Sequence, residues 1–330
     1  METIGTGVKG KIIQVPCARI DDRAVMVTGR WLRVASIFDE ELVEGEIAPA
    51  PPKFVPKVKQ SGLRADLFSF PDRIDQSTPQ YDYAFEWDNV AVARTSNFSD
   101  WWENKLPQET RKNVRRSVKK GATVRVVEYD DEFVRGIKAI YDETPIRQGS
   151  KFWHYGKDVE TVRRENGTYR ERCEYIGAYF QEKLIGFMRF VYVGNAAKIM
   201  QILASVHHTD KRPMNAMIAK AVEVCQERGI SYLVYSKFRF GNKKESPLAE
   251  FKRRNGFEEM LFPRYYVPFT FKVHVAVKLK LYLGLLGLLP PELIDRLLRA
   301  RTFVLQQRAK LMPSSVSQPA LPAGSGGAGE

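Results

Sequence analysis

The sequence predicts a mixed α+β fold, in which helices flank a central, mostly antiparallel sheet. Between residues 175 and 204, three apolar runs are joined only by short polar turns, at Gln181-Glu182-Lys183 and at Gly194-Asn195. Turns this short connect antiparallel neighbours. Beyond residue 204, two amphipathic segments alternate with two further apolar runs. This order predicts that the three-stranded meander lies at the centre of the sheet.

The first part of the chain is predicted to contain a small β unit and then a loop. Residues 12–37 alternate apolar and polar positions around an Asp21-Asp22 turn, which is typical of strands. Residues 49–62 carry Pro49, Pro51, Pro52 and Pro56. Because proline disfavours both helix and central strand, we expect a linker there. Residues 81–93 then combine aromatic and β-branched side chains, which favours a strand.

A basic amphipathic helix is predicted over residues 111–120. Its six basic side chains fill about half of the helix circumference, and Val114 and Val118 share the other half. This face either follows the phosphates of a tRNA or is simply solvated. Gly121 ends the helix, and we expect the preceding pair Trp101 and Trp102 to lie in the core.

The remaining elements follow from periodicity and from their end signals. Pro145 stops one helix, Pro213 suits the first turn of another because its missing N–H costs nothing there, and Asn255-Gly256 is a left-handed helix stop. The expected strands are 124–127, 175–180, 184–192, 198–204 and 232–236, with a return strand after residue 256. The expected helices are 130–144, 158–165, one from Pro213 to Gly229 and one ending at Asn255.

Composition indicates a globular protein with a strong positive charge. Lys and Arg outnumber Asp and Glu by 52 to 39, and the net charge of +13 favours anionic partners such as RNA, nucleotide phosphates or an acidic membrane surface. The three cysteines, Cys17, Cys173 and Cys225, lack metal-ligand spacing, so we expect a reducing compartment and no metal. The first 30 residues contain no signal-peptide core, which indicates a cytoplasmic protein.

The last 58 residues are predicted to form amphipathic helices and a tail. The apolar tract at 281–289 is far shorter than the roughly 20 residues of a spanning helix, so no transmembrane segment is expected. Leu-rich, basic helices at 273–311 either pack on the preceding domain or contact the inner membrane face peripherally. Residues 312–330, rich in Pro, Gly, Ser and Ala, are expected to be disordered.

Five motifs, taken in order, resemble the Fem-like branch of the GNAT acyltransferase superfamily, which is related to the FemAB-type peptidyltransferases. They are WWxxxL from residue 101, RxxVRRxxKKG from 111, IYxET from 140, RQGxxFxHYG from 147 and FKxxNG from 251. The resemblance covers residues 66–270 and implies a GNAT-like sheet preceded by a remodelled or partial GNAT-like half. The implied division is a β unit at 1–48, a linker at 49–62, the rest of the first half at 63–122, the acyltransferase domain at 123–272, helices at 273–311 and a tail at 312–330.

The resemblance also implies where an acyl donor would bind. In this fold the donor phosphates rest on the loop after the third meander strand and on the next helix N-terminus, where free N–H groups attract anions. That loop lacks glycine here, so the donor is left open between acyl-CoA, acyl-carrier protein and aminoacyl-tRNA as co-substrates. A solvated surface loop is the alternative. The expected donor-binding residues are Ser205, His207, His208, Lys211, Arg212 and Asn215.

The resemblance implies that Lys252, in FKxxNG, stabilises negative charge during catalysis, unless it lies on a solvated helix face. His154 is the histidine that suits a general base, because the ordinary histidine pKa is near 6.5. Its loop concentrates donors and aromatic faces, so we expect either acceptor binding or a packed Ω-loop. The expected acceptor-binding residues are Arg147, Gln148, Lys151, Trp153 and Tyr155.

Two functions from different classes follow. The first is an N-acyltransferase, such as an N-acetyltransferase or an aminoacyltransferase, that acts on an amine of a bacterial cell-envelope or exopolysaccharide precursor. The second is a non-catalytic protein of the same fold that uses its basic surface to bind tRNA or an anionic membrane. Salt dependence separates them, because electrostatic RNA binding weakens steeply with salt whereas a donor pocket keeps its selectivity among thioesters.

Overall fold

The computed structural model describes residues 2–8, 11–147, 149–239 and 246–278. The chain divides into two compact units, residues 1–273 and 274–330. The helix α8 (Phe271–Lys278) spans the point of division. Most of the C-terminal helices and all of the tail predicted from the sequence lie outside the described residues.

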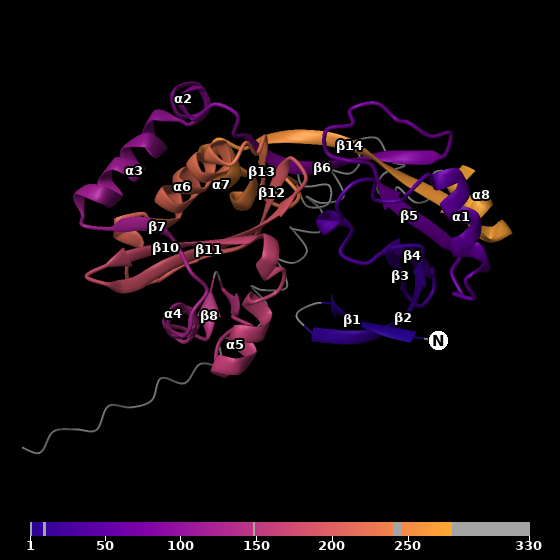
Figure 1. The fold of residues 1–330 in the computed structure, drawn as a ribbon, viewed down its shortest axis with the longest axis horizontal. Helices are drawn as coiled ribbons and strands as arrows, with labels where there is room; N and C mark the ends of the chain where they lie inside the picture. The colour runs from indigo at the N-terminus through magenta and orange to yellow at the C-terminus, as the bar shows by residue number, and fades with distance from the viewer. Residues whose placement is uncertain (1, 9–10, 148, 240–245, 279–330) are drawn as a thin grey trace, which may run out of the picture. The chain divides into compact units, whose positions relative to one another are not determined.

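The described residues of the first unit contain one sheet of twelve strands, in the order β1-β2-β3-β4-β5-β14-β6-β13-β12-β11-β10-β7 (Figure 1). Its neighbours are antiparallel except for β4 with β5 and β12 with β13, so the predicted α+β class with a mostly antiparallel sheet is confirmed. The strands are β1 (Glu2–Val8), β2 (Lys11–Ile20), β3 (Arg23–Thr28), β4 (Val34–Ile37), β5 (Leu67–Pro71), β6 (Ala84–Arg94), β7 (Thr123–Val127), β10 (Cys173–Phe180), β11 (Lys183–Val193), β12 (Ala196–Ala204), β13 (Tyr232–Val234) and β14 (Glu258–Pro268).

The N-terminal half contains β1 to β5 and one helix. The segment expected to be a linker forms α1 (Pro51–Gln60), because Pro51 and Pro52 occupy the first turn, where a missing N–H is tolerated. Phe54 and Val58 of this helix are fully buried in a core shared with β3, β4, β5 and β14. The helix therefore belongs to the packed structure.

The C-terminal half has helices on both faces of its sheet. The meander β10-β11-β12 forms as predicted. It does not lie at the centre of the sheet, because the strands of the N-terminal half and β14 extend the sheet on one side only and leave β7 alone beyond the meander on the other. Apolar side chains of α6 (Pro213–Glu227) pack on one face together with α3 (Gln108–Lys119), whereas α4 (Asp131–Tyr141) and α5 (Val159–Asn166) cover the other face (Figure 1). The shorter elements are α2 (Phe98–Asp100), β8 (Ile146–Arg147), β9 (Ser150–Lys151) and α7 (Pro247–Arg254).

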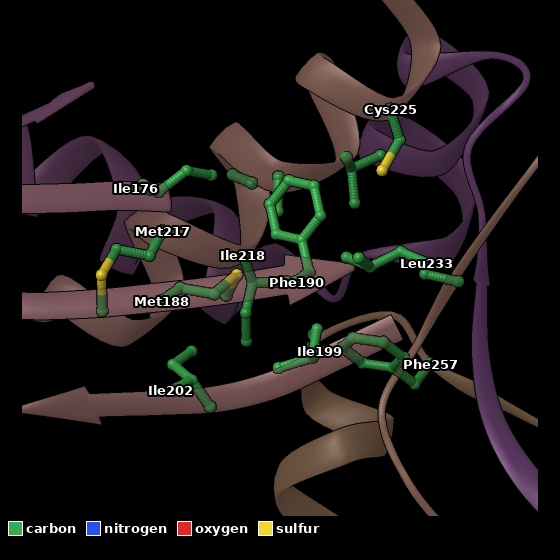
Figure 2. Close-up of a cluster of buried hydrophobic side chains, with 14 of the residues drawn as sticks. Ile176, Met188, Phe190, Ile199, Ile202, Met217, Ile218, Cys225, Leu233 and Phe257 are labelled. Atoms are coloured by element: carbon green, nitrogen blue, oxygen red, sulfur yellow. The ribbon is translucent and has the colours of Figure 1, made fainter. Parts of the chain in front are cut away.

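The largest core lies between the meander and α6. Figure 2 shows Phe190 of β11 projecting among Ile218, Met188 and Leu233, with Cys225 of α6 above. Phe190 is completely buried. Truncating such a ring to alanine costs about 3–5 kcal/mol of stability in comparable cores. This core fixes α6 on the sheet and thereby fixes the position of its N-terminus.

The strands β12 and β13 pair in parallel over only three residue pairs, the last of which joins Lys198 to Val234. β12 then continues to Ala204. Within the described ranges, residues 199–204 of β12 have no strand partner on the side of β13. We call this opening between β12 and the chain after β13 the split.

The split has a local cause in the backbone after β13. Ser236 adopts a left-handed conformation with φ of 52°, which turns the chain. The N–H of Tyr235 donates to the carbonyl of Ala91, and the N–H of Ala91 donates to the carbonyl of Ser236. The chain thus follows β6 instead of β12, and the split opens.

Helix α7 crosses beside the split. The Ser246 side chain caps its start by accepting from the N–H of Ala249 at 3.1 Å. Its end is the predicted left-handed stop, with φ of 73° at Gly256. A Cβ on Gly256 would lie 2.6 Å from Nε1 of the buried Trp101. Glycine is therefore required there both for its conformation and for the close approach of the indole.

Candidate functional site

The predicted donor loop is ordered by its own side chains. Ser205 is buried, its Oγ lies 3.0 Å from Nδ1 of His208, and the N–H of His207 donates to the same Oγ at 3.2 Å. Burial, together with the charges of Lys211 and Lys183, lowers the pKa of His208. His208 is therefore largely neutral near pH 7, and the fixed charge of this loop comes from Lys211 and Arg212.

Lys211 and Arg212 differ in how they are held. The Nζ of Lys211 lies 4.1 Å above the ring of Phe180 and 3.6 Å from a carboxylate oxygen of Asp210. Arg212 is exposed and adopts a left-handed φ of 52° as the residue before α6. The C-terminal end of α3 reaches the same loop, since Lys120 Nζ donates to Asp210 at 2.9 Å. The basic helix and the donor loop thus form adjoining surfaces.

The N-terminus of α6 lacks the side-chain cap that α4, α5 and α7 possess. Asp130, Asp158 and Ser246 each accept from a backbone N–H in the first turn of their helix. Arg212 makes no such hydrogen bond at the start of α6. The first-turn N–H groups of α6 thus lack the protein acceptor found at the other three helices, which suits them to an anion.

Lys252 is connected to this helix start through a pair of asparagines. Asn215, in the first turn of α6, donates through Nδ2 to Oδ1 of Asn255 at 2.8 Å. Asn255 lies one turn after Lys252 on α7. The structure thus brings Asn215 of the predicted donor-binding set close to the helix that carries the predicted catalytic lysine.

The Lys252 side chain is fully buried, with 0% exposure. Its Nζ donates to the carbonyl oxygen of Lys237 at 2.5 Å and lies 4.8 Å from the centre of the Tyr235 ring. Burial, and then the charge of Lys198, lowers the pKa of Lys252 to about 8. Lys198 itself pairs with Glu41 at 2.6 Å.

A cavity of about 520 Å³ opens where β12 and β13 part. Both residues of the last strand pair, Lys198 and Val234, line it, and so do Ser236 and Lys237 just beyond. The N-terminal half and β14 supply most of the remaining wall. Its polar side chains are Glu40, Glu41, Asp72, Arg73, Asp88, Asn89, Asn195, Ser236, Lys198, Lys237 and Arg264, and its apolar ones include Val43, Ile47, Ile74, Val90, Val193, Val234 and Phe262.

A chain of ion pairs forms one wall of the cavity. Arg264 pairs with Glu40 at 2.6 Å and with Asp88 at 3.0 Å, and Lys237 donates to Asp88 at 2.8 Å. Burial alone would raise the pKa of Asp88, but the hydrogen bond from Lys237 and the charge of Arg264 outweigh it and hold that pKa below its ordinary value. Asp88 therefore stays charged at neutral pH. Lys237 joins this chain to Lys252 through its backbone carbonyl.

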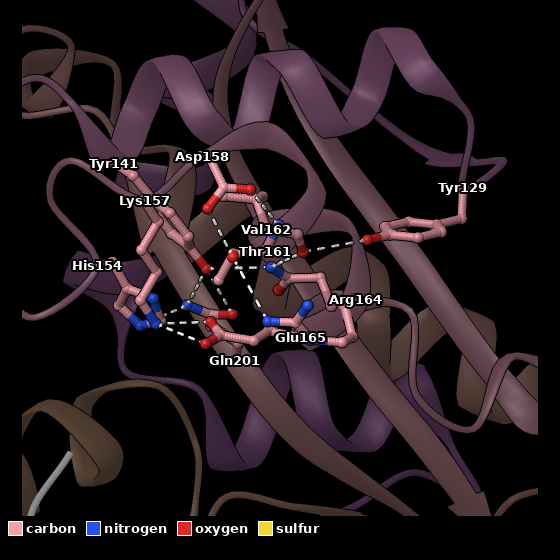
Figure 3. Close-up of polar contacts among 11 residues, drawn as sticks. Tyr129, Tyr141, His154, Lys157, Asp158, Thr161, Val162, Arg164, Glu165 and Gln201 are labelled. Atoms are coloured by element: carbon pink, nitrogen blue, oxygen red, sulfur yellow. Dashed lines mark hydrogen bonds and ion pairs between the residues drawn. The ribbon is translucent and has the colours of Figure 1, made fainter. Parts of the chain in front are cut away.

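His154 lies elsewhere, beside Tyr141 and Gln201 on the α4–α5 face (Figure 3). The rings of Phe152 and Trp153 also contact it. Its ring stacks on Tyr141 at 4.2 Å between centroids, and Gln201 Nε2 lies 3.2 Å from its Nε2. Because Gln201 donates there, the proton of the ring resides on Nδ1, which is buried without a hydrogen-bond partner. Burial, followed by the charges of Lys157 and Arg147, lowers the pKa of His154 to about 3. The imidazole is therefore neutral, and the nitrogen that a base would use is occupied.

The predicted acceptor loop lies beside the donor loop. Arg147 donates to the carbonyl of Ala204 at 2.9 Å, next to Ser205. Trp153 is 53% exposed, with Lys157 Nζ 3.7 Å above its ring. Lys151 and Tyr155 are exposed as well, whereas Gln148 lies outside the described residues. None of the described members of this set lines the cavity.

The structure thus brings the predicted groups together at two places. The donor loop and the acceptor loop meet near Ala204, and the start of α6 meets the end of α7, which carries Lys252, through Asn215 and Asn255. The Lys252 ammonium contacts the carbonyl of Lys237, a residue that lines the cavity. The cavity residues were missed from the sequence. The sequence signal for such residues is a charged side chain within an apolar strand, as at Asp88, Lys198 and Arg264. In the described part of the chain no helix has the length and hydrophobicity needed to cross a bilayer.

No protein-family model and no curated protein matches this chain. Solved structures do share its fold. FemX is 12% identical, with 79% of this chain and 87% of FemX covered at a TM-score of 0.55. L-PGS from Bacillus licheniformis is 15% identical, with 82% and 88% covered at 0.52. The C-terminal domain (DUF2156) of a putative lysylphosphatidylglycerol synthetase from Agrobacterium fabrum is 14% identical, with 80% and 86% covered at 0.51.

Sequence identities this low show a shared fold alone. The chain has the GNAT-like fold in the form found in Fem-like proteins, which confirms the resemblance predicted from its motifs.

Proposed function

We propose that the protein is an acyltransferase that moves an acyl or aminoacyl group from a phosphate-bearing carrier to an amine. The observation that carries the proposal is the position of Lys252, a fully buried lysine whose ammonium lies at the point where two parallel strands part. Burying an ammonium costs free energy, so a site that retains one needs a role for the charge. Stabilising an oxyanion is such a role.

The carrier phosphates are proposed to bind at the start of α6. The uncapped N–H groups there, with Lys211 and Arg212, form a site for an anion. From Ala204 back to Lys198 is six residues of β12, or about 20 Å at 3.3 Å per residue. A donor arm that leaves the loop would run along the unpaired edge of β12, which offers N–H and C=O groups to an amide-bearing arm.

The proposed chemistry is one nucleophilic substitution reaction at the acyl carbon. The acceptor amine attacks the carbonyl carbon, the oxygen becomes an oxyanion, and the bond to the carrier sulfur or oxygen then breaks. The attacking nitrogen loses a proton, and the leaving group takes one up. Lys252, with a pKa of about 8, is charged at neutral pH and stabilises the oxyanion or the leaving group. Positioning of the two substrates supplies the rest.

The proposed roles of the other predicted residues follow from their places. We propose that His154 positions Gln201 and Tyr141 within the α4–α5 face, because its Nε2 already accepts a hydrogen bond. Lys151, Trp153 and Tyr155 are proposed to contact the far end of a long acceptor, such as a cell-envelope or exopolysaccharide precursor. The basic helix α3 adjoins the donor loop through Lys120 and is available to a tRNA carrier.

Donors of three classes follow from the fold and its named relatives. The relatives include a putative lysylphosphatidylglycerol synthetase, a name that describes the joining of lysine to a phospholipid. Aminoacyl-tRNA therefore belongs beside acyl-CoA and acyl-carrier protein in a donor screen. Each of the three presents an acyl group on a phosphate-bearing carrier.

The test is a transfer assay with acetyl-CoA, an acyl-carrier protein and lysyl-tRNA as donors, comparing the full chain with Lys252→Met. Methionine keeps the volume of the buried side chain and removes its charge. We expect a loss of about 100- to 1000-fold in kcat, as for removal of an oxyanion donor. The control is Arg254→Met on the same helix, whose side chain is 71% exposed, and its rate should stay within twofold.

Undiminished transfer by Lys252→Met would remove the proposed role. If none of the three donors supports transfer while the protein binds tRNA with a steep salt dependence, the non-catalytic function is favoured instead.

A further inference from the structure

We infer that the end of the sheet near the β3–β4 turn is a peripheral surface that contacts a lipid bilayer containing anionic lipids. The inference concerns a surface away from the split and does not depend on the proposed transfer. It also differs from the sequence-based expectation, in which helices at 273–311 contact the membrane. Three observations support it: a fully exposed tryptophan, two further exposed apolar side chains beside it, and the positive charge around them.

The first observation is the exposure of Trp31, in the turn between β3 and β4. Its side chain is fully exposed, whereas Trp101 is 1% exposed. The turn requires Gly29, which has φ of 91° and where a Cβ would lie 2.1 Å from the carbonyl oxygen of Leu32. A tight turn thus keeps in water a large aromatic ring that would be stabilised by leaving it.

Three neighbouring strands bring other segments to the same place. β4 pairs with β5 at Leu67, and β14 pairs with β5 at the same residue. Just outside this row, the N–H of Asp66 donates to the carbonyl of Arg33 at 2.8 Å, and the N–H of Phe269 donates to the carbonyl of Asp66 at 2.9 Å. The turn after β3, the segment before β5 and the segment after β14 therefore adjoin one another.

The second observation is that two more apolar side chains are exposed on these segments. Leu32 is 44% exposed and Phe271, at the start of α8, is 82% exposed. Three side chains are few for a stable protein–protein interface, which buries about 800 Å² on each partner. Tryptophan is instead typical of the membrane–water interface, where its ring lies at the level of the lipid headgroups.

The third observation is the charge around these side chains. Arg30, Arg64 and Lys272 are exposed, and none has an ion-pair partner in the part of the chain that the structure describes. The one acidic residue of the three segments, Asp66, already pairs with Arg33 at 2.8 Å. Hydrogen bonds from Arg33 lower the pKa of Asp66, and the nearby charge of Lys272 lowers it further.

This charge selects an anionic occupant. Exposed arginine and lysine side chains are attracted to the negative surface of a bilayer with anionic lipids. The chain after residue 278 has more basic than acidic residues, so it does not offer the opposite charge. We call this surface the sheet-end patch, and its members are Arg30, Trp31, Leu32, Arg64, Phe271 and Lys272.

The sheet-end patch is separate from the proposed transfer site. Pro71, at the other end of β5 from Leu67, lines the cavity, and the four-residue step between them spans about 13 Å at about 3.3 Å per residue. No member of the patch lines the cavity. The lipid is therefore bound as a surface, and its headgroup need not be a substrate.

The experiment measures cosedimentation of the full chain with vesicles, without donor or acceptor. The vesicles contain phosphatidylcholine alone, or an equal mixture of it with phosphatidylserine or with phosphatidylglycerol. At low salt we expect about tenfold stronger binding to both anionic mixtures than to phosphatidylcholine, and agreement between the two within about twofold. Absence of binding to the anionic vesicles would overturn the inference. So would binding to phosphatidylglycerol alone, because a surface that responds to charge does not distinguish the two headgroups.

Variants then locate the contact. Trp31→Ser should weaken binding to phosphatidylserine vesicles about tenfold, whereas Trp87→Ser, which changes a ring that is 47% exposed on β6, should stay within about twofold. Arg30→Glu should weaken it about fivefold. Its matched control is Lys53→Glu, the same reversal of charge at an exposed position of α1. Undiminished binding by Trp31→Ser would overturn the inference.

Tryptophan fluorescence separates this surface from the rest of the chain. Residues 279–330 contain no tryptophan, so a shift of the emission to shorter wavelength on binding to vesicles reports on other segments. We expect such a shift in the natural chain. Trp31→Phe keeps an aromatic ring, and it should retain most of the binding while losing most of the shift. A full shift in Trp31→Phe, or binding of the natural chain without any shift, would contradict insertion of Trp31.

Discussion

Two regions of the molecule each bury a basic side chain, yet they are built for different purposes. At the split, Lys252 has a carbonyl partner, a lowered pKa that still leaves it charged at pH 7, and a cavity beside it. On the α4–α5 face, His154 is stacked on the Tyr141 ring, is neutral, and does not line that cavity. A buried titratable group therefore indicates a site only when open space adjoins it. Burial by itself serves packing equally well.

The largest expected effect concerns the pH dependence of the rate. If charged Lys252 is needed for transfer, kcat falls tenfold per pH unit above its pKa of about 8, and about 100-fold by pH 10. Lys252→Arg should move this fall beyond pH 10, because guanidinium stays protonated there. The measurement is a pH–rate profile for both proteins. A rate that is flat from pH 7 to 10 in the natural chain would separate Lys252 from the chemistry.

The next effect is on stability, where the two buried bases should respond with opposite signs. Lys252→Met removes a desolvated charge and should leave the free energy of unfolding unchanged or raise it by up to about 2 kcal/mol. His154→Ala removes a ring packed between Tyr141 and Phe152 and should lower it by about 1–3 kcal/mol. Urea unfolding at pH 7 measures both. A loss larger for Lys252→Met than for His154→Ala would reverse the comparison.

A smaller effect is expected in the acid range. The pKa of His154 is about 3 in the folded chain and near 6.5 when unfolded, so between these values the unfolded chain binds the extra proton. The contribution of His154 to the free energy of unfolding is thus fully present above pH 6.5. It is lost as the pH falls, by up to about 2 kcal/mol at pH 5. His154→Phe should abolish this part of the loss. Identical pH profiles of unfolding for the two proteins would contradict the neutral, buried state.

The smallest effect is expected at the surface between α3 and the donor loop. Lys120 pairs with Asp210 at 2.9 Å, and both side chains are largely solvated. Lys120→Gln should change the free energy of unfolding by less than about 0.5 kcal/mol, because exposed ion pairs contribute little. The same change should measurably raise the Michaelis constant of a tRNA donor at low salt. A change in stability above 1 kcal/mol would show that this pair is structural.

The sequence could predict the elements around the split because their signals are local. Pro213 and Gly229 bracket α6, and Asn255-Gly256 ends α7 where expected. At residues 49–62 the prolines predict a linker, but Pro51 and Pro52 occupy the first turn of α1, where proline fits a helix. Local rules thus succeed when the position of a residue within its element is considered as well as its type.

The cavity could not be predicted in this way because its residues come from distant segments. Glu40 meets Arg264 across 224 positions, and Asp88 meets both Arg264 and Lys237 only after β14 has paired with β6. The same limit applies to His154, whose environment of Tyr141 and Gln201 is assembled by α4 and β12. A charge placed inside an apolar strand is the signal that would have indicated such a site.

The most direct test of the account is a crystal structure of the full chain with a non-hydrolysable acyl-CoA or aminoacyl-tRNA analogue. The account predicts phosphate groups at the N-terminus of α6, an arm along the unpaired edge of β12, and an acyl oxygen within hydrogen-bonding distance of Lys252 Nζ. An analogue bound away from the split, with Lys252 contacting only protein atoms, would contradict it.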